Sequence, residues 1–118
     1  MAIVLGTIHN TSKAVDTDLF SSPFTYTAST DVRPAPMKKI IIQIAVATGG
    51  SNLRALIGDG STVETVILGT LTTAQVVYNF ELLWRSGDTV DLQYNGISGP
   101  MDVNMKVLQS DDIQLYGG

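Results

Sequence analysis

The chain contains no cysteine, so neither disulfide bonds nor thiolate metal sites hold it together. It has one histidine, His9, and charged residues make up only 15% of its 118 residues, against about 25% in an average protein. One histidine among scattered aspartates rarely supplies enough metal ligands, so we expect no metal and no cofactor. The mean hydropathy of +0.21 is high for a small domain in water. This value favours burial of surface against a partner, although a monomer with a Thr/Ser/Gly/Asn surface stays an alternative.

Positive charge is scarce as well, since the sequence has seven Lys and Arg but eleven Asp and Glu, which gives a net charge of −4. Nucleic-acid binders usually carry a basic stripe, but the adjacent pair Lys38 and Lys39 points to opposite faces of a strand. The apolar run Ile40–Ala47 is far shorter than the roughly 20 residues of a membrane-spanning helix. The first residues lack the positive segment of a secretory signal. We therefore expect no nucleic-acid partner, no membrane partner and synthesis in a cytoplasm.

Apolar and polar residues alternate with a period of two along most of the chain, which is typical of half-buried β-strands. The apolar members are mainly β-branched and aromatic, the types that suit a pleated surface. No comparable stretch has the period of a helix. The apolar positions are Phe24, Tyr26 and Ala28, then Ile40, Ile42, Ile44 and Val46, then Tyr78, Phe80, Leu82 and Trp84, then Val90, Leu92 and Tyr94, and finally Val103, Met105 and Val107.

Turn signals separate these stretches at the spacing of a β-sandwich. Thr48–Asn52 and Gly58–Ser61 each lie between two apolar runs and predict hairpin loops. Ser86–Asp88 predicts a tight turn in which Gly87 takes a positive φ, and Asn95–Pro100 predicts a longer loop. The count is about eight strands, the number in a jelly roll. The sequence therefore predicts an all-β, antiparallel, jelly-roll-like sandwich that occupies the whole chain as one domain.

Two segments differ from this core. Residues 11–22 are polar and predict a long loop, and residues 110–118 are acidic and then apolar. The latter segment either adds an edge strand to its own domain or extends as a C-terminal arm to a neighbour. Apolar residues near both termini are the predicted interface residues, and they are Ile3, Leu5, Ile113, Leu115 and Tyr116.

Catalytic and phosphate-binding motifs are missing from the sequence. His9 has no accompanying Gly-x-Ser-x-Gly elbow, and Gly58–Thr62 lacks the Lys-Ser/Thr pair of a phosphate loop. Asp88 and Asp91 are close in sequence, but a turn position and an outward strand position explain them. We expect no catalytic residues and a protein that is not an enzyme.

One stretch resembles a known class of proteins. Residues 75–94, QVVYNFELLWRSGDTVDLQY, resemble a hairpin of small β-sandwich virion proteins of tailed phages and related viruses, in which an apolar-aromatic strand enters a Ser-Gly-Asp-Thr turn. The resemblance extends over residues 37–108. It implies a head decoration (cement) protein, a minor capsid protein, or a small tail or fibre component. It also implies a virion location, contacts with the major capsid protein or other virion subunits, and a homo-oligomer, either trimer or dimer.

The alternative hypothesis is a carbohydrate- or receptor-binding sandwich, such as a module of a tail fibre. Trp84, Tyr94 and Tyr26 are aromatic residues that could stack on sugars, although their alternation with polar neighbours favours positions in the core. The binding hypothesis rests otherwise on exposed loops. These loops are Gly49–Asn52, Gly58–Ser61 and Asn95–Pro100.

Overall fold

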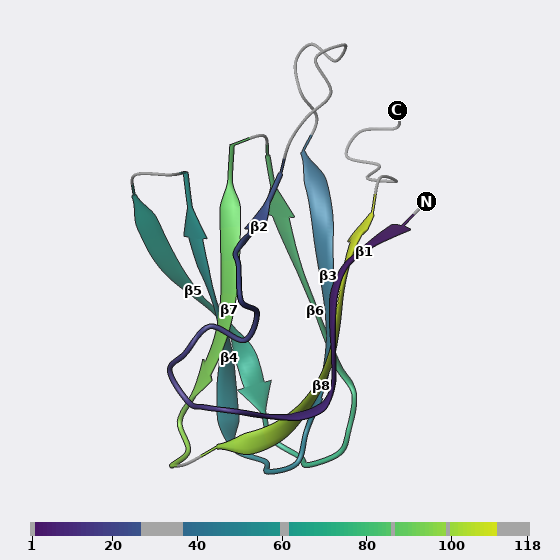
Figure 1. Ribbon diagram of the computed structural model, residues 1–118, viewed down its shortest axis with the longest axis vertical. Helices are drawn as coiled ribbons and strands as arrows, with labels where there is room; N and C mark the ends of the chain where they lie inside the picture. Colours follow the sequence, from purple (N-terminus) through teal and green to yellow (C-terminus); the bar gives the residue numbers. More distant parts are fainter. Residues whose placement is uncertain (1, 27–36, 60–61, 86, 99, 111–118) are drawn as a thin grey trace.

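The computed structural model describes residues 2–26, 37–59, 62–85, 87–98 and 100–110, which form eight strands and no helix (Figure 1). No helix in this part of the chain is long and apolar enough to cross a membrane. The strands are β1 (Ala2–Lys13), β2 (Phe24–Thr25), β3 (Lys38–Val46), β4 (Ser51–Gly58), β5 (Val63–Leu71), β6 (Tyr78–Trp84), β7 (Thr89–Asn95) and β8 (Met101–Ser110).

The strands form two four-stranded antiparallel sheets that face each other. Sheet one has the order β1-β8-β3-β6 and sheet two the order β2-β7-β4-β5. Consecutive strands change sheet at every described connection except β4 to β5. This alternation produces the two Greek keys of a jelly roll. The predicted eight-stranded antiparallel sandwich is therefore confirmed.

The core lies between the inner faces of the two sheets, as the period-two pattern predicts. Burial alternates residue by residue along β3, β7 and β8, so every second side chain of these strands is buried. Packing two inner faces together in this way removes both from water, and each fully buried aliphatic or aromatic side chain contributes about 1.5–3 kcal/mol. The fully buried side chains include Ile40, Ile42, Ile44, Val90, Leu92, Val103 and Val107.

The turns lie at the predicted positions, but two of them join strands of different sheets instead of neighbouring strands of one sheet. The loop before Ser51 joins β3 of sheet one to β4 of sheet two, and residues 85–88 join β6 of sheet one to β7 of sheet two. Neither is a hairpin, so the stretch over residues 75–94 contributes β6 to sheet one and β7 to sheet two instead of two paired strands. Gly87 has the predicted positive φ, +94°. The Gly58–Ser61 prediction is confirmed, because β4 and β5 pair antiparallel up to Gly58 and Val63.

The predicted long loop over residues 11–22 begins later than expected, because β1 continues through Lys13. The chain then runs beside β7, where the Asp16 N–H donates to the Tyr94 carbonyl at 2.9 Å and the Leu19 N–H donates to the Leu92 carbonyl at 2.8 Å. Leu19 is buried in the core. This segment therefore covers part of the edge of β7 before β2 begins.

Candidate functional site

The predicted interface residues fall in two groups. Ile3, at the start of β1, is 48% exposed, whereas Leu5 is half-buried and packs against the core. The other three, Ile113, Leu115 and Tyr116, lie outside the described residues. The role of all five stays a prediction.

The residues considered for chemistry have ordinary structural positions. His9 is exposed on β1, an edge strand of sheet one. The Asp59 carboxylate accepts a hydrogen bond from the Thr62 N–H at 2.9 Å, and the Asp88 carboxylate accepts one from the Arg85 N–H at 3.0 Å. Both carboxylates thus stabilise turns. Within the described ranges, no three His, Cys, Asp or Glu side chains are grouped so that they could hold a metal ion.

The three aromatic residues considered for sugar stacking are in the core. Tyr26, Trp84 and Tyr94 are all buried, and the rings of Tyr26 and Trp84 pack at a centroid distance of 5.5 Å. The Tyr94 hydroxyl donates to the Lys13 carbonyl and accepts from the Met101 N–H, which ties three segments together. None of the three presents a ring to solvent, which confirms the prediction that these aromatic residues lie in the core.

The loops of the binding hypothesis do not form one surface. The corner at Gly50 and the loop at Gly96 lie side by side, since a Cβ on Gly96 would be 3.5 Å from the Gly50 carbonyl oxygen. The loop after Gly58 is at the other end of β4. Because eight extended residues span about 26 Å, no small ligand contacts all three loops.

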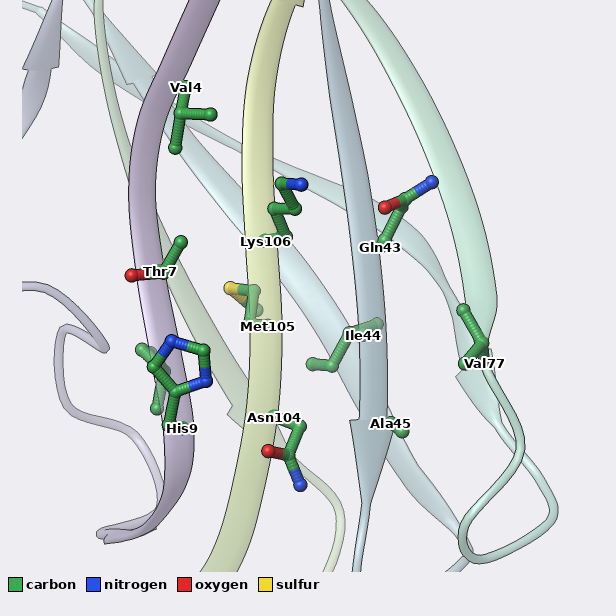
Figure 2. A pocket seen from close by; sticks show the side chains of 11 residues that line it. Val4, Thr7, His9, Gln43, Ile44, Ala45, Val77, Asn104, Met105 and Lys106 are labelled. Carbon is green, nitrogen blue, oxygen red and sulfur yellow. The ribbon is translucent and has the colours of Figure 1, made fainter.

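A hollow that the sequence did not reveal crosses the outer face of sheet one (Figure 2). This outer hollow has a volume of about 550 Å³ and is lined by residues of β1, β8 and β3, with Val77 at the far side. Thr7, Lys106 and Gln43 form one cross-strand row, because they are register partners across these three strands. The row comes from positions far apart in the chain, so no local motif indicates it.

The outer hollow carries hydrogen-bonding groups and one full positive charge. His9, Asn104 and Lys106 line it, and no Asp or Glu is among the described lining residues. The Asn104 Oδ1 already accepts from the Asn10 N–H at 2.8 Å, which leaves its amide NH₂ to donate. The rest of the lining is largely apolar and includes Val4, Val77 and Met105, so the hollow suits a ligand that has an apolar body and a hydroxyl or anionic group.

The outer face of sheet two carries a polar network. The Arg54 guanidinium contacts the Asp16 carboxylate at 3.0 Å and donates to the Gln93 amide oxygen at 2.7 Å, and the Gln93 amide donates to Asp18 at 2.7 Å. Burial raises the pKa of Asp91 above its usual value, and the nearby Asp18 carboxylate raises it further. The network fastens the segment after β1 to the sheet.

Apolar side chains that remain exposed gather on β5 and around β6, the strands that end the two sheets. Ile67 is 73% exposed and Val63 is 62% exposed, both on β5, and Val77, just before β6, is 61% exposed. An apolar run such as Val66–Leu68 is also typical of a buried central strand. The sequence therefore did not show whether this strand lies at the centre or at the edge of a sheet. The further exposed members are Val66, Val76 and Leu83.

No family model matches the chain. No curated protein matches it either. Among solved structures, a carbohydrate-binding module of Cellvibrio mixtus lichenase 5A in complex with cellotriose is similar with a TM-score of 0.44 and 12% identity, over 89% of this chain and 97% of that one. A structure of infectious bursal disease virus, Gx strain, is similar with a TM-score of 0.44 and 14% identity, over 100% of this chain and 32% of that one. Neither similarity assigns a function to any residue.

Proposed function

We propose that the chain is a non-enzymatic structural subunit of a virion, a capsid decoration (cement) or minor capsid protein that stabilises a shell through subunit–subunit contacts. The observation that carries the proposal is the exposed apolar surface on β5 and around β6. Side chains such as Ile67 and Val63 lie mostly in water on the isolated chain. Exposed apolar strands at a sheet edge are association sites in β-proteins.

The low charge of the chain supports the same function. Soluble monomers usually protect their sheet edges with charged residues, above all lysine, but β5 carries a single charged residue, Glu64. A shell subunit has no need of such protection, because neighbouring subunits cover its edges. The partners that fit this role are further copies of the chain, in a dimer or trimer, and the major capsid protein or other virion subunits.

The first test is the solution mass of the full chain and of a chain truncated after Ser110, measured by light scattering from low micromolar to about millimolar concentration. We expect a dimer or trimer of the full chain. If the oligomer is lost on truncation, it depends on residues 111–118; if it persists, the contact lies within residues 1–110. A full chain that stays monomeric throughout and does not bind viral shells contradicts the proposal.

A second candidate function, carbohydrate or receptor binding, is favoured by the outer hollow. Lys106 and the Asn104 amide in its lining can donate hydrogen bonds, and no Trp, Tyr or Phe is among the described lining residues. We expect weak binding of a glycan with an acidic group, loss of that binding in Lys106→Gln, and unchanged binding in the control Lys39→Gln on the same face, outside the hollow. No binding on a broad glycan panel that includes acidic sugars contradicts this function.

A further inference from the structure

The four edges of the two sheets differ in how well they are protected. The two-residue β2 offers almost no edge, and β1 is interrupted by two register shifts along its pairing with β8. On β6, Glu81 is charged and lies 3.4 Å from the Lys39 ammonium group. Bulges, short strands and charges all discourage pairing with a further strand. β5 also has one charged residue, Glu64, and one register shift, but it carries more exposed apolar side chains than any other edge strand.

β5 offers a regular unpaired stretch at Val63–Ile67. No described strand pairs with its outer side, since β5 ends the order β2-β7-β4-β5. The shift in its register with β4 falls after this stretch, because Arg54 pairs with Ile67 and Leu53 pairs with Gly69. Within this stretch, which lies at the edge of its sheet (Figure 1), every second residue directs its backbone N–H and C=O away from β4, in regular extended geometry.

We infer that β5 pairs with β5 of a second copy, antiparallel and about a two-fold axis at Thr65, so that two sandwiches share one continuous eight-stranded sheet. The inference rests on the proposed function and names the contact that would carry it. A two-fold contact requires a self-complementary strand. In this register Val63 of each copy lies opposite Ile67 of the other, and Thr65 lies opposite Thr65.

The one charge of the strand permits a second copy as the occupant. Glu64, the one charged residue of β5, lies opposite Val66 of the other copy, so no two carboxylates face each other directly. The two Glu64 carboxylates are diagonal neighbours at about 7–8 Å, and both side chains are exposed to solvent. Removing this residual repulsion with Glu64→Gln tightens the dimer.

Disulfide cross-linking tests the register, and the absence of natural cysteine makes each variant a single-cysteine protein. Opposite residues of an antiparallel pair have Cα atoms about 4.5–5.5 Å apart, within the range that a disulfide spans. Under mild oxidation Thr65→Cys forms a covalent dimer. The control Thr70→Cys, exposed on the same strand but five residues from the axis, does not. Equal cross-linking of the two variants, or none in either, overturns the register.

A lysine substitution tests the contact itself. Ile67→Lys raises the dissociation constant of the dimer by at least about tenfold in light scattering, whereas the control Met37→Lys leaves the mass unchanged, because Met37 is an exposed apolar residue just before β3 that is not part of the apolar surface on β5 and around β6. Far-UV circular dichroism verifies the fold of both variants. An oligomer that survives Ile67→Lys, or a wild-type trimer, overturns β5 pairing and leaves the proposed function standing. A wild-type monomer overturns the pairing too.

Discussion

Replacing Trp84 with alanine is expected to lower the free energy of unfolding by about 3–5 kcal/mol. Trp84 ends β6 and is 1% exposed, so its removal leaves a cavity at the end of the core. Its indole N–H donates to the Gln109 side-chain oxygen at 3.1 Å in a buried position. The substitution therefore removes apolar burial and also leaves a buried amide oxygen without its donor.

The conservative variant Trp84→Phe separates these two contributions. Phenylalanine keeps most of the apolar contact with Tyr26 but has no N–H, so we expect a smaller loss of about 1–3 kcal/mol. The measurement is urea unfolding followed by far-UV circular dichroism, because Trp84 is the only tryptophan and its fluorescence is lost in both variants. A loss below about 1 kcal/mol for Trp84→Ala would contradict the buried position of the ring.

The second large effect is expected at Gly49, in the corner between β3 and β4. A Cβ at this position would lie 2.4 Å from the carbonyl oxygen of Thr72, a backbone atom of the β5–β6 connection. That connection is held nearby, since the Gln75 N–H donates to the Val46 carbonyl at 2.8 Å. Because backbone atoms cannot rotate away as side chains do, Gly49→Ala forces the two loops apart, at a cost of about 3 kcal/mol.

The adjacent glycine provides the control. Gly50 has a φ of +103°, but a Cβ there meets no atom within 4 Å. Gly50→Ala therefore costs only the conformational strain of an L-residue at positive φ, about 1–2 kcal/mol. Urea unfolding of the two variants should rank Gly49→Ala as the more destabilised. The opposite order would show that the contact with Thr72 is not close in solution.

The candidate sites show what local sequence can and cannot indicate. The sequence contains none of the common catalytic loop motifs, but the outer hollow brings together Thr7, Gln43 and Lys106, which are dozens of residues apart in the chain. The alternation of apolar and polar residues did not indicate the exposed face of β5 either. Its residues Val63 and Ile67 have the composition of any strand, and their exposure depends on which strand lies beyond them.

By itself the sequence determined which side chains face the core. Side-chain direction along a strand alternates with every residue, so the pattern Ile40-Ile42-Ile44 specified an inner face wherever the strand lies. The conformation of the turn at Gly87 was likewise a local property, because only its own φ had to be positive. Tertiary structure decided the rest. A turn of the same local geometry can join two paired strands of a hairpin or two strands in different sheets. Pairing with strands distant in the sequence places β6 and β7 in different sheets and leaves β5 at the edge of its sheet.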